Sequence, residues 1–221
     1  MRIVLLHAFP LDERMWKAQQ DALDGHEVIA PRLYGLGSSM DAWAAAILER
    51  IEGSFVACGA SMGGYCALAL ARTAPARLTG LLLAGARVEA DSPERRAGRA
   101  DTIELIRSAG AEGLWREMRP KLFTHDSEPA VVERGHHIVL DQEPGELVAA
   151  VEAIRDRPDS SDVVAGLDVP VVVAVGEHDP FLSVDEARGI GGRLKVFHGV
   201  GHLPSLERPE EFTGLLTELA A

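Results

Sequence analysis

Residues 55–64 read Phe-Val-Ala-Cys-Gly-Ala-Ser-Met-Gly-Gly. The first four residues form a continuous apolar run, which is typical of a strand buried on both faces of a sheet. A Gly-Ala-Ser-Met-Gly turn follows, and residues 61–74 have the composition of a helix that ends before Pro75. A strand, a tight turn carrying a serine and a helix make up a nucleophile elbow. We therefore predict that Ser61 is a nucleophile, while a glycine-rich turn without catalytic function stays the alternative.

Short apolar runs alternate with amphipathic segments on both sides of this stretch. Strands are predicted at residues 3–6, 27–30, 55–58, 78–84, 171–175 and 194–197, and helices at residues 13–23, 41–51, 61–74 and 210–219. This alternation is typical of parallel strands joined by helices. It predicts an α/β protein.

The strand signals stop between residues 87 and 162. Helical spacing of apolar residues recurs there, around residues 102–108, 113–122 and 146–155. We therefore predict two parts. Residues 1–86 and 163–221 form an α/β core, and residues 87–162 form a helical cap inserted between two strands.

The composition restricts the class of protein and of partner. The chain has 221 residues, of which 47% are hydrophobic and 25% charged, as in one globular domain. A formal net charge of −12 without a cluster of Lys and Arg argues against nucleic acid as a partner. The apolar run at residues 3–6 is too short for a secretion signal and no run approaches membrane-spanning length, so we expect a cytoplasmic protein with no membrane partner. The spacing of Cys58 and Cys66 matches no zinc or redox motif. We expect the protein to use no metal ion and no cofactor.

A serine nucleophile needs a general base, and the base needs an acid that orients it. His202 follows the last predicted strand and Asp179 follows the strand before it, so both should reach the sheet edge that carries Ser61. The chain order Ser, Asp, His is the one found in the α/β-hydrolase fold. His198 is the nearest alternative for the base, and Glu177 is the nearest alternative for the acid.

Acyl transfer also needs two N–H groups aimed at the developing oxyanion. We expect these donors to be the amides of Met62, directly after the nucleophile, and of Phe9, in the loop after the first strand. An ordinary turn is the alternative for that loop. His7 is expected to order the loop through hydrogen bonds rather than to act as a base.

The substrate pocket is expected beneath the cap. Leu114 and Trp115 are candidates for its wall together with His7, although a stripe of Leu and Trp on a helix is also typical of a packed core. Arginines between Arg87 and Arg119 could receive a substrate carboxylate. They alternate with acidic residues, so a solvated helix face is the other interpretation.

Nearly the whole chain resembles α/β-hydrolase superfamily enzymes with a helical cap, in particular 3-oxoadipate enol-lactonases and small carboxylesterases. The resemblance rests on Leu-Leu-His-Ala-Phe-Pro at residues 5–10, Gly-Ala-Ser-Met-Gly-Gly at 59–64, Gly-Glu-His-Asp at 176–179 and Gly-His-Leu-Pro-Ser-Leu-Glu-Arg-Pro at 201–209. The last segment is the most specific. The resemblance implies an α/β-hydrolase fold and the same roles for the matching residues, which are Ser61, Asp179, His202, Phe9 and Met62.

Three departures from the resembled family stand out. Relatives usually carry Gly at the position of Ala8, and commonly an acidic residue at the position of Arg32. They usually begin with an antiparallel hairpin before the strand at residues 3–6, so we expect a sheet of about six strands without it. Its edge could be open or covered by a partner chain, which leaves a homodimer possible.

The prediction is a serine hydrolase that cleaves a small carboxylic ester or lactone through an acyl-enzyme on Ser61. Carbon–carbon bond hydrolysis, thioester hydrolysis and acyl transfer would use the same site. A non-catalytic, ligand-binding protein of this fold is the alternative from a different class. The natural substrate does not follow from the sequence.

Overall fold

The computed structural model describes all residues from 1 to 221. Its sheet has six strands: β1 (Arg2–Leu6), β2 (Glu27–Ile29), β3 (Phe55–Ala60), β4 (Leu78–Ala84), β5 (Val171–Gly176) and β6 (Arg193–Phe197). The strand order is β2-β1-β3-β4-β5-β6, and every neighbouring pair is parallel. The predicted α/β class and a mostly parallel sheet of about six strands are therefore confirmed.

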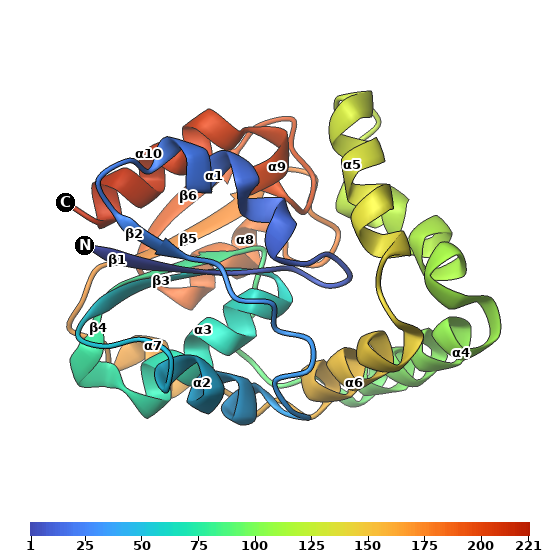
Figure 1. The fold of residues 1–221 in the computed structure, drawn as a ribbon, viewed down its shortest axis with the longest axis horizontal. Helices are drawn as coiled ribbons and strands as arrows, with labels where there is room; N and C mark the ends of the chain where they lie inside the picture. The colour runs from blue at the N-terminus through green and yellow to red at the C-terminus, as the bar shows by residue number, and fades with distance from the viewer.

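Helices cover both faces of the sheet (Figure 1). Helices α1 (Lys17–Ala22) and α10 (Pro209–Leu219) lie on one face, and α2 (Met40–Leu48) and α3 (Met62–Thr73) lie on the other. Strand β5 shows why the central runs are apolar throughout: Val172 and Ala174 pack in the core beneath α10, whereas Val173 and Val175 pack on the opposite face. None of the helices is both long and apolar enough to cross a membrane.

The order of the strands determines where on the sheet a ligand site is expected. The chain turns from β1 outward to β2 and then returns to β3 on the other side of β1. Such a reversal leaves a crevice between the loops at the carboxyl ends of β1 and β3, where α/β proteins commonly bind ligands. The loop that carries Phe9 follows β1, and Ser61 follows β3.

Between β4 and β5 the chain forms α4 (Pro93–Leu122), α5 (Pro129–Leu140), α6 (Pro144–Arg155) and α7 (Ser161–Ala165). We call α4 to α6 the cap, because these helices lie beyond the carboxyl ends of the strands (Figure 1). Helix α4 is interrupted at Gly110, where φ is 64° and ψ is −164°. The segments predicted at 102–108 and 113–122 are the two parts around this interruption, whereas α5 was not predicted.

The remaining elements connect these layers and are short. They are the 3-10 helices η1 (Glu13–Trp16) and η2 (Pro75–Arg77), α8 (Val184–Ile190) and α9 (Pro204–Glu207). Helix α8 follows the loop that carries Asp179, and α9 follows the loop that carries His202. Both loops start from carboxyl ends of strands, on the edge that also carries Ser61.

Candidate active site

Ser61 occupies the turn between β3 and α3. Its φ of 49° makes it the only non-glycine residue with a positive φ, and its ψ is −114°. The Ser61 amide donates a hydrogen bond to the Ala84 carbonyl oxygen at 2.7 Å, which fixes the turn against β4. A Cβ at Gly63 would lie 2.0 Å from the Leu6 carbonyl oxygen, so only glycine allows α3 to approach β1 this closely. The turn thus holds a serine in a conformation that L-residues rarely adopt.

This backbone strain can be measured. The free energy of unfolding of Ser61→Gly should exceed that of Ser61→Ala by roughly 1 kcal/mol, because glycine adopts the observed φ and ψ without a Cβ clash. Urea unfolding of the two purified variants tests this, since both lack the hydroxyl group. A Ser61→Gly variant less stable than Ser61→Ala would mean that the turn is not strained.

His202 and Asp179 form a buried pair. His202 Nδ1 lies 2.8 Å from Asp179 Oδ2, and the two side chains are 2% and 0% exposed. The other carboxylate oxygen, Oδ1, accepts hydrogen bonds from the amides of Phe181 at 2.8 Å and Leu182 at 3.2 Å. The carboxylate is therefore held by its own loop and directs Oδ2 at the imidazole. A proton on Nδ1 satisfies this contact and leaves Nε2 free to accept another.

The imidazole is also enclosed by its neighbours. The Phe181 ring packs edge-on against it, with ring centroids 4.6 Å apart. A Cβ at Gly85, whose φ is +59°, would lie 2.9 Å from the His202 ring and 3.0 Å from Asp179 Oδ2. Any side chain at residue 85 would push the pair apart. No signal in the sequence marks Gly85, because its place beneath the pair follows only from the strand order.

The alternative base and acid lie apart from this pair. His198 Nδ1 is 3.4 Å from Glu177 Oε2, and the His198 side chain is 83% exposed. The amide of Gly199 donates to Glu177 at 3.0 Å and, with His198, lowers the pKa of that carboxyl group from its usual value. Neither residue lines the cavity that contains Ser61. These two residues form a second, solvated pair at the surface.

Both expected oxyanion donors flank the crevice between β1 and β3. Met62 is the first residue of α3, and the first N–H groups of a helix have no partner within the helix. The Phe9 amide makes no hydrogen bond within the protein, although the neighbouring Ala8 amide donates to Met15 Sδ at 3.2 Å. Two donors are thus available beside Ser61. The partial positive charge on these N–H groups also favours a negative charge that develops beside Ser61.

His7 lies behind the Phe9 loop and is fully buried. Its Nε2 accepts a hydrogen bond from the Leu33 amide at 2.9 Å, so the proton resides on Nδ1, which lies 3.2 Å from the Ala8 carbonyl oxygen. Burial, the largest cause, lowers the pKa of His7 from 6.5 to about 4. A neutral imidazole thus joins two loops, and His7 does not line the cavity.

The low pKa of His7 predicts a pH dependence of stability. Between pH 6.5 and about 4 the unfolded chain binds a proton at His7 that the folded protein does not bind. The free energy of unfolding should therefore fall as pH decreases through this window, by roughly 3 kcal/mol in all. Urea unfolding of wild type and His7→Gln at several pH values isolates this contribution. Parallel curves for the two proteins would contradict it.

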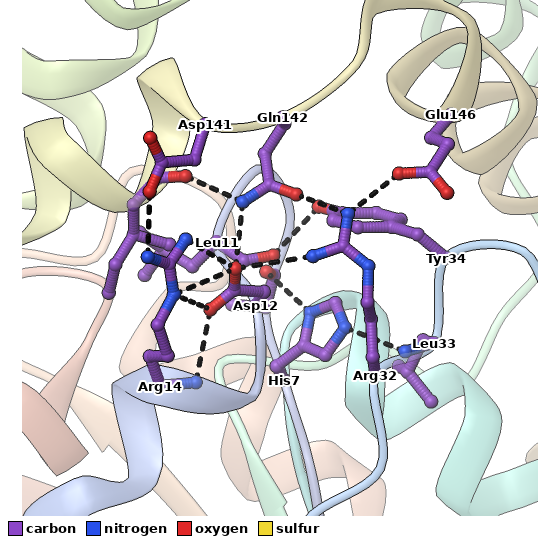
Figure 2. A network of polar contacts seen from close by, with 12 residues as sticks. His7, Leu11, Asp12, Arg14, Arg32, Leu33, Tyr34, Asp141, Gln142 and Glu146 are labelled. Carbon is purple, nitrogen blue, oxygen red and sulfur yellow. Dashed lines mark hydrogen bonds and ion pairs between the residues drawn. The ribbon is translucent and has the colours of Figure 1, made fainter.

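A polar network joins the same loop to the cap (Figure 2). The buried Asp12 carboxylate accepts hydrogen bonds from Arg14 at 2.7 Å and Gln142 at 2.8 Å, and lies 3.3 Å from Arg32. Arg32 also donates to Gln142 at 2.9 Å and Glu146 at 2.6 Å. Burial opposes the charge on Asp12, but the hydrogen bonds from Arg14 and Gln142 lower the pKa of its carboxyl group. Arg32 thus links the Phe9 loop to the cap.

Ser61 and His202 line one cavity of about 70 Å³ beneath the cap. The other lining residues are Phe9, Tyr65, Arg87, Asp91, Arg95, Arg99, Met118, Ile154 and Phe181. The Ser61 hydroxyl makes no hydrogen bond to the imidazole, a contact that often becomes short only when substrate binds. No group of three or more His, Cys, Asp or Glu side chains is placed to hold a metal ion.

Leu114 and Trp115 do not line this cavity. Leu114 is fully buried in the core between cap and sheet, and Trp115 stacks on His136 with ring centroids 4.9 Å apart. Met118, one turn further along α4, lines the cavity instead. The spacing of Arg95 and Arg99 is a signal that would have found part of the polar wall, because residues four apart share one face of a helix.

The parallel sheet, its strand order and the serine turn after β3 are those of the α/β-hydrolase fold. A model of the Alpha/beta hydrolase family matches residues 3–215. The chain belongs to this family.

Named relatives cover nearly the whole chain. The chain is 27% identical, over a 246-residue alignment, to a pimeloyl-[acyl-carrier protein] methyl ester esterase of Aromatoleum aromaticum, covering 98% of this chain and 97% of that protein. A thermophilic esterase from Thermogutta terrifontis, in a malate-bound structure, is 34% identical with a TM-score of 0.92, covering 99% of this chain and 88% of the esterase. The enol-lactonase from Burkholderia xenovorans LB400 is 25% identical with a TM-score of 0.87, covering 99% and 90%. The predicted resemblance to esterases and enol-lactonases is thus confirmed.

Proposed function

We propose that the protein is a serine hydrolase that cleaves a small carboxylic ester or lactone, with Ser61 as nucleophile, His202 as general base and Asp179 as the orienting acid. The observation that carries the proposal is that Ser61 and His202 line one cavity while Asp179 holds His202 from behind. Similarity to two esterases and an enol-lactonase supports ester bonds as the target.

The proposed reaction has two steps. Ser61 Oγ forms a bond to the acyl carbon as its proton moves to His202 Nε2, and the amides of Phe9 and Met62 donate to the oxyanion. The proton then passes to the leaving oxygen, and the bond between this oxygen and the acyl carbon breaks. Water repeats the sequence on the acyl-enzyme, which releases the acid and restores Ser61.

Asp179 acts through His202 in this proposal. Its contact with Nδ1 holds the tautomer that leaves Nε2 as the acceptor, and its charge stabilises the imidazolium that forms. The cap closes the cavity over Ser61 and supplies Arg95, Arg99, Met118 and Ile154 to its wall, and Asp91 lies just before its first helix. Substrate selection is therefore a property of the cap.

Labelling with a fluorophosphonate tests the proposal against a non-catalytic protein of this fold. We expect one covalent adduct on Ser61, located by mass spectrometry, and its loss in Ser61→Ala and His202→Ala. Hydrolysis of short esters and lactones, compared with thioesters and carbon–carbon substrates, distinguishes the reactions. An unlabelled protein without activity on any of these substrates would overturn the proposed function.

A further inference from the structure

Asp91, two residues before α4, is surrounded by guanidinium groups. Arg99 Nε donates to Asp91 Oδ2 at 3.0 Å, and Arg157 Nη1 donates to Asp91 Oδ1 at 2.7 Å. Arg95 Nε lies 3.6 Å from Asp91 Oδ1, which is too long for a hydrogen bond. The Asp91 and Arg157 side chains are 0% and 3% exposed. One buried carboxylate thus faces three arginines, and Arg157 alone suffices to balance its charge.

The positive charge that remains faces the cavity over Ser61. Arg95 and Arg99 both line this cavity, and their side chains are 39% and 27% exposed. Arg95 Nε is buried but has no hydrogen-bond partner in the protein. A buried N–H group without a partner is costly and is usually paired with a ligand or water. Arg95 and Arg99 therefore present unused donors to whatever occupies the cavity.

The other two arginines near the cavity, Arg157 and Arg87, already have partners in the protein. Arg157 is held beside Asp91 with its guanidinium 4.0 Å from the ring centroid of Tyr65, and Tyr65 lines the cavity. Arg87, also a lining residue, is neutralised by Glu186 at 2.8 Å. In a protein of net charge −12, the Arg95 and Arg99 side chains form a local positive site within the catalytic cavity. Because both arginines line the cavity that also contains Ser61, they do more than form a helix face that only solvent contacts.

We propose that Arg95 and Arg99 form a carboxylate-binding subsite, so that the preferred substrates are esters or lactones that carry a second, ionised carboxylate. Arginine suits this ligand because its planar N–H groups match the two oxygens of a carboxylate. The carboxylate would bind at the cap wall while the ester carbonyl lies at Ser61. This inference rests on the proposed hydrolysis at Ser61 and assigns the substrate class.

Matched substrates test the subsite. The monomethyl esters of succinic, glutaric, adipic and pimelic acids are compared with analogues in which a primary amide replaces the free carboxylate. At about pH 7.5, where the carboxylate is ionised, kcat/KM should favour the acid over its amide by roughly 10-fold or more for at least one chain length. No preference for the acid at any length would overturn the proposal.

Substitutions of single arginines test whether Arg95 causes the preference for a substrate with a free carboxylate. Arg95→Gln should lower the ratio of kcat/KM for the acid to kcat/KM for its amide by roughly 10-fold, because the amide lacks the charge that Arg95 would bind. Arg96→Gln is the matched control, because Arg96 lies on the same helix but pairs with Asp156 outside the cavity. An equal loss on both substrates in Arg95→Gln, or the same ratio change in Arg96→Gln, would contradict the subsite.

Binding without turnover separates this inference from the proposed function. Calorimetry with adipate and the other dicarboxylates on Ser61→Ala should show binding that weakens roughly 10-fold in Ser61→Ala combined with Arg95→Gln. Absence of binding by every dicarboxylate would overturn the subsite even if wild type hydrolyses neutral esters. Binding with no hydrolysis of any ester by wild type would overturn the proposed function and retain the anion site.

Discussion

Ser61→Ala should lower kcat/KM for a short ester by roughly 10⁴-fold or more while the protein stays folded. The substitution removes the hydroxyl group that we propose forms the acyl-enzyme, and it keeps the Cβ that the backbone at φ 49° already accommodates. The amides of Phe9 and Met62 remain, so residual activity above the uncatalysed rate is expected. Steady-state kinetics with a chromogenic ester measure the loss, and thermal unfolding checks the fold.

Ser54→Ala is the matched control for this variant. Ser54 lies just before β3, is exposed and is remote from the cavity. Its kcat/KM should equal that of wild type. Turnover near the wild-type value in a purified Ser61→Ala variant would show that Ser61 is not the nucleophile, and the labelled residue would then have to be sought elsewhere.

The His202→Ala substitution should lower kcat/KM for a short ester almost as much as Ser61→Ala does, again by roughly 10⁴-fold. Without an acceptor for its proton the Ser61 hydroxyl is a weak nucleophile, and no other histidine lines the cavity. Because we propose that the two residues act in the same step, the double variant should be little worse than either single variant. Losses that multiply would mean that Ser61 and His202 act independently.

The second acid–histidine pair provides the control for His202. His198→Ala and Glu177→Gln alter an exposed pair outside the cavity, so both variants should retain wild-type kcat/KM. Asp179→Asn should lose activity but less than His202→Ala, because the imidazole keeps its place and loses its charged partner. An inactive His198→Ala beside an active His202→Ala would reverse the assignment of the base.

The core elements follow from the sequence because their signals are local. The apolar run at residues 78–84 is β4 without any change of bounds, and the helix predicted at residues 61–74 is α3 (Met62–Thr73). Parallel strands buried on both faces read as unbroken apolar runs, and Pro75 ends the helix. No tertiary information is needed for either signal.

The cap was predicted less completely. Helix α5 (Pro129–Leu140) contains two histidines, a glycine and four β-branched residues, which are poor helix formers. It is helical because Ile138 and Val139 pack into the core, which also holds Trp115. Helix α4 starts at Pro93, earlier than the apolar spacing indicates, because its first turns carry charged residues rather than an apolar face.

The sequence by itself determined the α/β class and the loops that carry Ser61, Asp179 and His202, because each follows a predicted strand and parallel strands end at one edge of the sheet. Only the tertiary structure decided which residues surround Ser61. It placed Met118 rather than Trp115 in the cavity wall and brought Arg157 to Asp91 across more than sixty positions of the chain. The physical reason is that strand signals are local, whereas the wall of a cavity depends on how a helix rotates against the sheet, and packing across the whole core sets that rotation.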